Sequence, residues 1–487
     1  MLRRTKIVAT LGPASTRPEV LQEMIAAGVD VVRLNFSHGT AQDHIDRAKT
    51  VRECANNVGR PVGILVDLQG PKIRIAKFAD EGIFLREGDP FILDAGLGES
   101  EGTQQSVGLT YPALIKDVKP GDYLLLDDGR IELHVTKIKG KKIHTNTIIG
   151  GELSNNKGIN LRGGGLSAPA ITDKDKQDIL TAAKIDCDYL AISFPRSPED
   201  VYEARDLLRE AGGHGHIIAK VERFEALEAV TQIIDASDGI MVARGDLGVE
   251  IGDAELPGVQ KRLIAEARER NRVVITATQM MESMIQNPIP TRAEVFDVAN
   301  AVLDGTDAVM LSAETATGKH PVKVVEATDR ICTRVEQEPL AKKSTHRLNA
   351  KFEHIDEAIA MSTMYAANHL HVSAIAALTE TGSTALAMSR ISSGIPIYAF
   401  TSNPQSVGRA CLFRGVTPVL VEKLLTDHIT ANYTIVSILK AQGVVKDGDR
   451  VIITKGDLLG AGGGTNAMKI VELGNMPRPG SVEGVDA

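Results

Sequence analysis

Charged residues close two consecutive apolar runs between His216 and Gly248, and their types and spacing suit metal chemistry. Side chains alternate along a β-strand, so Lys220 and Glu222 point to one side of the first run. Asp246 follows the second run in a glycine-rich turn. One ammonium and two carboxylates then meet at one rim of a sheet or barrel, where two carboxylates suit a hard cation such as Mg²⁺. An ion pair beside a turn-forming aspartate explains the same residues, and the spacing does not separate the two interpretations.

Short apolar runs alternate with helical segments along most of the chain, and these elements must position the charged residues. The runs span residues 5–10, 31–36, 62–67, 189–194, 217–222, 240–243, 273–277 and 308–312. Eight β-then-α units predict a (β/α)₈ TIM barrel, with an open parallel sheet as the competing topology. Residues 1–70 and 169–340 form this predicted catalytic barrel.

Two further domains are expected. Residues 71–168 show strand and turn signals with little helical periodicity, which predicts a small all-β barrel domain inserted after the third strand. Residues 341–487 alternate strands and helices again, which predicts a C-terminal open α/β domain.

Composition narrows the class of protein. The chain has 487 residues, of which 43% are hydrophobic and 24% charged, as in a soluble globular protein. A net charge of −8, 3% aromatics and no tryptophan argue against nucleic acid as a partner. The four cysteines form no CxxC pair, which argues against a disulfide frame or a zinc site. No run approaches a membrane span of roughly 18 apolar residues or a signal-peptide core, so we expect a cytoplasmic protein.

Polar residues gather where six of the predicted strands end, which is the rim that carries active sites in (β/α)₈ barrels. They are Arg33, Asn35, Ser37 and His38, then Asp67, Lys72 and Arg74, then Lys220 and Glu222, then Arg244 and Asp246, then Thr276, Thr278 and Gln279, and finally Ser312 and Glu314. A cap, a turn or an ion pair explains each of them singly. Several cations with two carboxylates suit phosphorylated substrates and a metal. No GxxxxGK[ST] motif occurs, so a bound nucleotide is not held by a P-loop.

These residues lie in long motifs that resemble the pyruvate kinase family, in the family's order. The motifs span residues 10–13, 33–38, 67–74, 156–160, 219–222, 241–248, 276–283, 290–294 and 311–315. The resemblance covers nearly the whole chain, including the β insert and the C-terminal domain. It implies transfer of the phosphoryl group of phosphoenolpyruvate to ADP, giving pyruvate and ATP, the final step of glycolysis.

The resemblance also implies a role for each residue. Glu222 and Asp246 would hold Mg²⁺, for which Mn²⁺ can substitute, and the catalytic residues would be Lys220, Arg33, Lys72 and Thr278. The substrate would contact Arg33, Thr278 and the turn formed by Ala243, Arg244, Gly245 and Asp246. Asn35, His38, Arg74, Asp128 and Lys157 would face ADP or ATP, although Asp128 and Lys157 alone read as surface residues. The insert would close as a lid that excludes water.

One departure from the family pattern concerns potassium. Members that depend on K⁺ carry glutamate where this chain has Lys72, and members that need no K⁺ carry lysine there. The other residues of the monovalent-cation site remain, namely Asn35, Ser37, Asp67 and Leu68. We expect the Lys72 ammonium to replace the ion, so that K⁺ is not required.

The C-terminal domain resembles the family's regulatory domain. Its candidate effector loop consists of Thr379, Glu380, Thr381, Gly382, Ser383 and Thr384, whose hydroxyl and N–H groups suit a phosphate. Without the resemblance, an ordinary helix-capping loop explains these residues. The loop lacks the basic residue of members that bind a sugar bisphosphate, so we expect AMP or a sugar monophosphate as the effector. The family is usually a homotetramer.

Two other functions compete with this interpretation. A Mg²⁺-dependent barrel lyase or aldolase can also carry Glu and Asp at successive strand ends, but it needs no nucleotide-binding lid. A non-catalytic metabolite sensor could keep the effector domain, but it would not need Lys220, Glu222, Asp246 and Thr278 intact.

Overall fold

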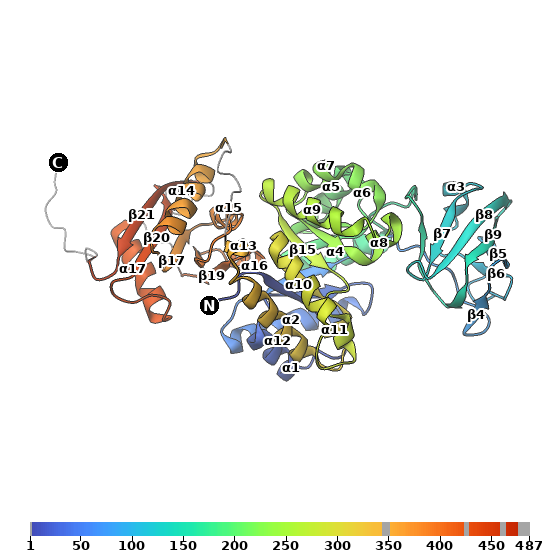
Figure 1. Cartoon of the computed structure of the whole chain (residues 1–487), viewed down its shortest axis with the longest axis horizontal. Helices are drawn as coiled ribbons and strands as arrows, with labels where there is room; N and C mark the ends of the chain where they lie inside the picture. The colour runs from blue at the N-terminus through green and yellow to red at the C-terminus, as the bar shows by residue number, and fades with distance from the viewer. Residues whose placement is uncertain (1, 343–350, 423–427, 458–463, 476–487) are drawn as a thin grey trace.

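The chain forms three bodies in a row, with a barrel in the middle, a β-rich insert on one side and an α/β domain on the other (Figure 1). The computed structural model describes residues 2–342, 351–422, 428–457 and 464–475. Parts of the predicted C-terminal domain, residues 343–350, 423–427, 458–463 and 476–487, therefore lie outside the described residues.

The central body is a closed barrel of eight parallel strands, which confirms the predicted topology over the open sheet. Each strand pairs with its neighbour in chain order, and the last returns to the first. The strands are β1 (Lys6–Thr10), β2 (Val31–Asn35), β3 (Gly63–Asp67), β12 (Tyr189–Ile192), β13 (His216–Val221), β14 (Gly239–Ala243), β15 (Val273–Ala277) and β16 (Ala308–Leu311).

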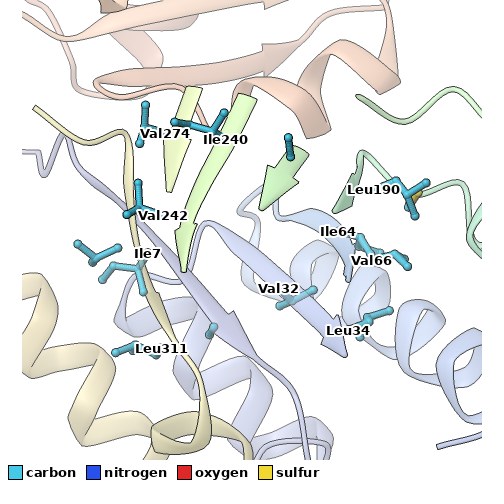
Figure 2. Close-up of a cluster of buried hydrophobic side chains, with 14 of the residues drawn as sticks. Ile7, Val32, Leu34, Ile64, Val66, Leu190, Ile240, Val242, Val274 and Leu311 are labelled. Carbon is cyan, nitrogen blue, oxygen red and sulfur yellow. The ribbon is translucent and has the colours of Figure 1, made fainter. Parts of the chain in front are cut away.

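Helices surround the barrel because alternate strand residues face outward and need an apolar cover. Ile7, Val32, Val66, Ile240 and Leu311 belong to this outer layer (Figure 2). The surrounding helices are α1 (Pro18–Ala27), α2 (Ala41–Val58), α4 (Asp173–Ile185), α5 (Pro198–Glu210), α6 (Phe224–Glu228), α7 (Val230–Ala236), α8 (Arg244–Ile251), α9 (Leu256–Glu269), α10 (Arg292–Asp304), α11 (Ala313–Ala316), α12 (Pro321–Val335) and α13 (Pro339–Lys342), with the 3₁₀ helix η1 (Glu282–Ile285).

The inward-facing strand positions set the place of the site. Val31, Leu65 and Ile218 lie in a buried cluster inside the barrel, whereas Val221 lies in the outer layer. Side chains alternate along a strand, so residues two or four positions beyond these inward residues also face the barrel axis. The predicted alternation around Val221 is therefore confirmed.

The insert contains β-structure as predicted, but it closes less completely than a single barrel. Its strands form a six-stranded sheet in the order β11-β7-β8-β9-β5-β6 and a separate pair, β10-β4. The incoming chain links the two edges of the larger sheet through isolated bridges, Arg74 to Gly158 and Ile75 to Leu109, instead of a strand ladder. The elements are β4 (Gly82–Leu85), β5 (Pro90–Asp94), β6 (Ser106–Gly108), α3 (Leu114–Asp117), β7 (Tyr123–Leu126), β8 (Ile131–Lys139), β9 (Lys142–Ile149), β10 (Gly151–Ser154) and β11 (Ile159–Leu161).

The C-terminal body is an open α/β sheet, as predicted. Its order is β19-β18-β17-β20-β21, with β21 antiparallel at one edge. The elements are α14 (Ile355–His369), β17 (Ala374–Leu378), α15 (Ser383–Ser389), β18 (Ile397–Thr401), α16 (Pro404–Ala410), β19 (Val416–Leu420), α17 (His428–Ala441), β20 (Arg450–Gly456) and β21 (Thr465–Glu472).

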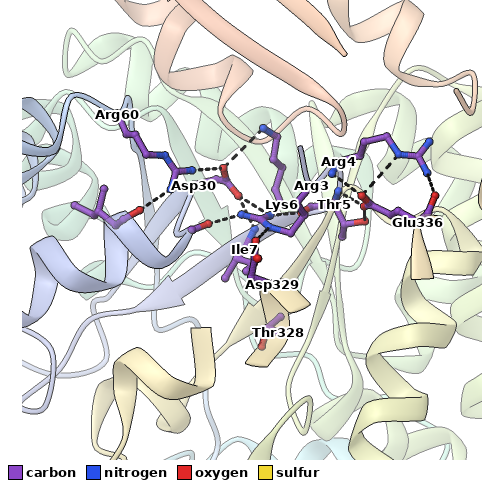
Figure 3. A network of polar contacts seen from close by, with 12 residues as sticks. Arg3, Arg4, Thr5, Lys6, Ile7, Asp30, Arg60, Thr328, Asp329 and Glu336 are labelled. Carbon is purple, nitrogen blue, oxygen red and sulfur yellow. Dashed lines mark hydrogen bonds and ion pairs between the residues drawn. The ribbon is translucent and has the colours of Figure 1, made fainter. Parts of the chain in front are cut away.

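Buried polar contacts join this domain to the barrel. Arg390, just after α15, pairs with Asp307, just before β16, and their side chains are 1% and 0% exposed. The start of β1 also contacts this domain, because Lys6 Nζ donates to the Val416 carbonyl at 2.7 Å. Within the barrel, the same segment is held by Asp30, which accepts from Arg3, and by Glu336, which accepts from the Thr5 N–H (Figure 3). The amino-terminal rim of the barrel is therefore closed by the C-terminal domain, and the opposite rim is left for a site. Within the described residues, no helix is both long and apolar enough to cross a membrane.

Candidate active site

A pocket of about 190 Å³ opens at the carboxyl-terminal rim of the barrel. It brings together residues at the ends of seven strands, six of which the polar strand ends predicted. Its predicted lining residues are Arg33, Asn35, Ser37, His38, Asp67, Leu68, Lys72, Arg74, Lys220, Glu222, Ala243, Asp246, Thr278 and Ser312.

Lys220 is the buried centre of this pocket. Its ammonium lies 2.9 Å from Glu222 Oε1 and 3.2 Å from Asp67 Oδ1, and it donates to Ser193 Oγ at 2.8 Å. Strand alternation produces this cluster, because Lys220 follows the inward-facing Ile218 by two positions and Asp67 follows Leu65 likewise.

The charges in this cluster support one another. Burial disfavours the Lys220 ammonium, but Asp67 and Glu222 outweigh burial and raise the pKa of the lysine. Burial also opposes ionisation of Asp67, yet Lys220 and Arg33 hold the pKa of that carboxyl below its ordinary value. Lys220 therefore carries a positive charge at neutral pH.

Arg33 adds a second cation from the neighbouring strand. Its Nε donates to Asp67 Oδ2 at 2.6 Å, and its Nη1 donates to Thr10 Oγ1 at 3.1 Å. Asp67 thus lies between two cations that both line the pocket. This arrangement can receive an anionic group with several oxygens.

Two carboxylates form the acidic side of the pocket. Glu222 Oε2 accepts from the Phe194 N–H at 2.9 Å, and Asp246 Oδ1 lies 3.6 Å from Lys72 Nζ. Burial raises the pKa of Glu222 against the attraction of Lys220, and repulsion from Asp246 adds to that rise. A divalent cation would relieve this repulsion, so the pair of oxygen donors fits a hard metal ion.

Thr278 has an unusual backbone conformation for a β-branched residue, with φ at +65°. Its Oγ1 donates to the Ala277 carbonyl at 2.6 Å and accepts from the Gly245 N–H at 2.9 Å. Helix α8 starts at this turn, as the glycine-rich sequence indicated. The Arg244 side chain lies apart from the pocket lining, because it donates to Asp297 Oδ1 at 2.6 Å.

The insert residues expected at the nucleotide lie apart from this pocket. Lys157 pairs with Asp127 at 2.7 Å, and Asp128 is exposed in a turn with φ at +58°. Arg74 does line the pocket, and its guanidinium also donates to the Asn156 carbonyl of the insert at 2.8 Å.

The candidate effector loop lies between β17 and α15. Gly382 has φ at +85° and donates its N–H to Thr379 Oγ1 at 2.9 Å. Thr384 Oγ1 lies 2.7 Å from Thr465 Oγ1 on β21. Several of the hydroxyls that could face a phosphate are therefore engaged within the loop and the sheet.

Five lining residues were not predicted, namely Gln69, Ser193, Phe194, Met241 and Met310. Ser193 follows the inward-facing Ala191 by two positions, so the alternation of its strand could have identified it. Conversely, Thr276 and Glu314 are buried away from the lining, where Thr276 donates to Thr306 at 3.0 Å and Glu314 accepts from the Ser312 N–H at 2.6 Å.

The central body of the chain is a closed (β/α)₈ barrel that carries cations and carboxylates at the carboxyl ends of its strands. This is the place of the active site in (β/α)₈-barrel enzymes. The family description "Pyruvate kinase, barrel domain" matches residues 2–325, and "Pyruvate kinase, alpha/beta domain" matches residues 357–471. The chain belongs to the pyruvate kinase family and is a phosphotransferase.

Individual relatives agree over nearly the full length. The chain is 57% identical to pyruvate kinase II of Salmonella typhimurium over 476 residues, which cover 97% of this chain and 99% of that protein. It is also 57% identical to a pyruvate kinase of Haemophilus influenzae over 459 residues, or 93% of this chain and 96% of that protein. A pyruvate kinase of Sporosarcina psychrophila is 42% identical over 490 residues, which cover 100% of this chain and 83% of that protein. Membership of this family removes the lyase and sensor alternatives.

Proposed function

We propose that this protein transfers the phosphoryl group of phosphoenolpyruvate to ADP, and that the resulting enolate is protonated to pyruvate. The observation that carries the proposal is the Lys220 ammonium, held charged 2.9 Å from Glu222 and 3.2 Å from Asp67 inside the rim pocket. A fixed cation at that place needs no reorganisation when negative charge moves from the enol oxygen to the nucleotide.

Lys220 and Arg33 stabilise the transferring phosphoryl group. Both side chains line the same pocket, and Asp67 orients both by pairing with each. The equatorial oxygens of the transferring group carry the charge in transit, which makes positioned cations the main tool for this reaction.

Glu222 and Asp246 would hold Mg²⁺, or Mn²⁺ in its place. Their oxygens repel each other across the pocket, and this repulsion favours a bound cation. The ion would neutralise substrate oxygens during transfer. Lys72 lies 3.6 Å from Asp246, so its ammonium supplies the monovalent charge and K⁺ is not required.

Thr278 and the start of α8 bind the substrate carboxylate beside the reacting carbon. The turn comprises Ala243, Arg244, Gly245 and Asp246. Thr278 Oγ1 takes part in the proton route to the enolate, since its hydroxyl lines the pocket and is held by the Gly245 N–H.

The nucleotide lies between the rim and the insert. Asn35, His38 and Arg74 line the pocket, and Asp128 and Lys157 would complete the nucleotide site when the insert closes as a lid. Closure excludes water, which would otherwise accept the phosphoryl group.

A phosphorylated effector, AMP or a sugar monophosphate, activates the enzyme from the loop of residues 379–384. Contacts between the loop and the barrel support activation from this loop. Helix α15 begins in the loop and ends beside Arg390, and Arg390 pairs with Asp307 just before β16. A kinetic panel with AMP, sugar monophosphates and a sugar bisphosphate tests the effector. Strongest activation by the bisphosphate would overturn this assignment.

The proposed assembly is a homotetramer. Large apolar side chains on and before α10 support a subunit interface, since Ile289, Phe296 and Leu303 are 71%, 69% and 42% exposed. The mass in solution, measured by light scattering, should be four times that of the chain. A monomeric mass would rule the assembly out.

The reaction itself is tested by pyruvate formation from phosphoenolpyruvate. We expect pyruvate and ATP in equal amounts only when both ADP and Mg²⁺ are present. Pyruvate formed at the same rate without ADP would contradict phosphoryl transfer to the nucleotide.

A further inference from the structure

The first helix after the insert holds two loops of the pocket without lining the pocket itself. Helix α4 starts with the capping box Thr172–Asp175, in which Asp175 Oδ2 accepts from the Thr172 N–H at 2.9 Å and from its hydroxyl at 2.6 Å. A capping box needs only one carboxylate oxygen. The second oxygen of Asp175 remains for another partner.

That second oxygen reaches the loop through which the chain leaves the barrel for the insert. Asp175 Oδ1 accepts from the Gly70 N–H at 3.1 Å, and the Asp175 side chain is 0% exposed. One carboxylate thus joins the outgoing chain at Gly70 to the returning chain at Thr172. The two ends of the insert are tied together at its base.

The loop held by Asp175 carries pocket residues on both sides. Gly70 has φ at +64°, and a Cβ added to it would lie 2.6 Å from Ser193 Cβ, so the loop runs directly against the segment that follows β12. Ser193 Oγ in turn donates to the Leu68 carbonyl at 2.7 Å and accepts from Lys220. The Lys72 N–H donates to the Gly70 carbonyl at 2.9 Å. The position of Gly70 therefore affects both Lys72 and the partner of Lys220.

The adjacent residue on α4 holds the neighbouring loop. Lys174 Nζ donates to the Phe36 carbonyl at 2.8 Å, between the lining residues Asn35 and Ser37. The Phe36 N–H also donates to the Asp67 carbonyl at 2.9 Å, so the two loops are bonded to each other.

We propose that Asp175, assisted by Lys174, is a positioning residue that fixes the loops after β2 and β3 for phosphoryl transfer. This inference rests on the proposed function for its kinetic consequence, but not for its structural one. Asparagine at position 175 has a single acceptor oxygen, so it can satisfy the cap or Gly70 but not both. Glutamate keeps two acceptor oxygens. In α10, Glu294 of the Thr291 box also accepts from Ser283 in a neighbouring segment, so glutamate can serve both roles.

The chain offers matched controls for each residue. The Thr40–Asp43 box at the start of α2 has the same spacing, and within the described part of the chain its carboxylate accepts hydrogen bonds from Thr40 alone. Lys176 is an exposed lysine on α4 that pairs with Glu203 at 3.8 Å. Asp43→Asn and Lys176→Met therefore remove a similar group without releasing a pocket loop.

The experiment combines hydrogen exchange with steady-state kinetics of the full-length protein. In Asp175→Asn we expect faster amide exchange in peptides covering residues 68–72, and in Lys174→Met in peptides covering residues 35–38. The KM for phosphoenolpyruvate should rise about ten-fold or more in Asp175→Asn, because small misplacements of positioned groups are costly. Asp175→Glu should restore both values, and both controls should match the unmodified protein in exchange and KM.

The proposal would be overturned if amide exchange at residues 68–72 in Asp175→Asn equalled that in Asp43→Asn. It would also be overturned if exchange in Asp175→Asn became faster while the KM for phosphoenolpyruvate stayed unchanged. Failure of Asp175→Glu to restore either value, while folded, would also overturn it. Absence of ADP-dependent activity in the unmodified protein would remove the proposed function alone, because the exchange comparison would still test the loop contacts.

Discussion

Lys220 keeps its charge inside the barrel because two strands bring carboxylates to it. Asp67 ends β3, and Glu222 directly follows β13, so both face the barrel axis beside the lysine. Asp67 also holds Arg33, which places a second cation toward the same space. Lys220 and Arg33 are therefore held in place by buried carboxylates. Their N–H groups are already oriented to donate to a bound phosphoryl group.

At this scale, Lys72 is the residue whose substitution gives the clearest change of behaviour. Lys72→Glu places a carboxylate near Asp246, which now lies 3.6 Å from the ammonium, and a monovalent cation must then offset the added charge. We expect the unmodified enzyme to be indifferent to K⁺ and Lys72→Glu to require it. Rates are compared with and without K⁺ at constant ionic strength, because surface charges respond to salt alone.

Lys77→Glu is the control, since it makes the same charge change at an exposed position. It should leave K⁺ independence intact. Complete dependence of the unmodified enzyme on K⁺ would show that the Lys72 ammonium does not replace the ion.

The roles of single residues were partly readable from the sequence. The period of two in a strand placed Lys220 and Glu222 on one side correctly, and the same rule applied to the strand of residues 189–192 would have found Ser193. Asp175 was not predictable in this way, because its partner Gly70 is 105 residues away and the carboxylate also reads as a helix cap.

At the scale of elements, the β insert is held against the barrel by a few polar contacts. Glu250 on α8 accepts from Asn160 Nδ2 of the insert at 3.3 Å and from the Phe224 N–H at 2.9 Å. Burial raises the pKa of Glu250 to about 7, against its hydrogen bonds, and Glu225 adds repulsion while Arg223 opposes it. Burial of this carboxyl therefore favours its neutral form, whereas the hydrogen bonds from Asn160 and Phe224 favour the ionised form.

The sign of the pH effect follows from this raised pKa. The unfolded carboxyl ionises near its ordinary value of 4.5, whereas the folded protein keeps the proton until about pH 7. The stability contributed by neutral Glu250 is thus fully present below the unfolded value and is lost as pH rises through about 7. Glu250→Gln stays neutral, so the thermal midpoint of this variant relative to that of the unmodified protein should be higher at pH 8 than at pH 5.

Glu87→Gln on the exposed surface of the insert is the matched control. Its thermal midpoint should differ from that of the unmodified protein by the same small amount at both pH values. A Glu250→Gln effect that is equal at pH 5 and pH 8 would mean that Glu250 does not titrate in this interval.

Whole elements were the most predictable feature of this chain. All eight barrel strands were identified, because buried parallel strands read as short apolar runs between amphipathic helices. The incomplete closure of the insert was missed, since isolated bridges such as Ile75 to Leu109 join residues whose pairing leaves no pattern in either segment.

At the scale of the whole molecule, the C-terminal domain and the barrel share a core. Buried residues inside the barrel, among them Val8 and Ile275, belong to the same cluster as Ile375 and Met388 of the C-terminal domain. Arg390 and Asp307 cross this junction with almost no exposed surface. The sequence indicated both domains but gave no sign of this contact, because the pair is 83 residues apart.

Loss of one partner of this buried pair should be costly. Arg390→Met leaves the Asp307 carboxylate buried without its guanidinium, and breaking such a pair costs about 3–5 kcal/mol. We expect a lower midpoint of thermal unfolding and weaker effector activation. The double variant Arg390→Met with Asp307→Asn should regain part of the stability, since it removes the unpaired charge.

Arg330→Met, at an exposed arginine of α12, is the control and should leave the midpoint nearly unchanged. If Arg390→Met behaves like this control, the pair does not hold the two domains together.

The most direct test of the proposed chemistry separates phosphoryl transfer from metal binding at Lys220. In Lys220→Met, kcat for pyruvate formation from phosphoenolpyruvate and ADP should fall about 10²–10³-fold or more, because a fixed cation is removed from the developing charge. Mn²⁺ binding, followed by electron paramagnetic resonance, should persist, since Glu222 and Asp246 remain. Lys176→Met should match the unmodified enzyme in both measurements. Retention of kcat in Lys220→Met, or loss of Mn²⁺ binding in proportion to the loss of kcat, would contradict the role given to this residue.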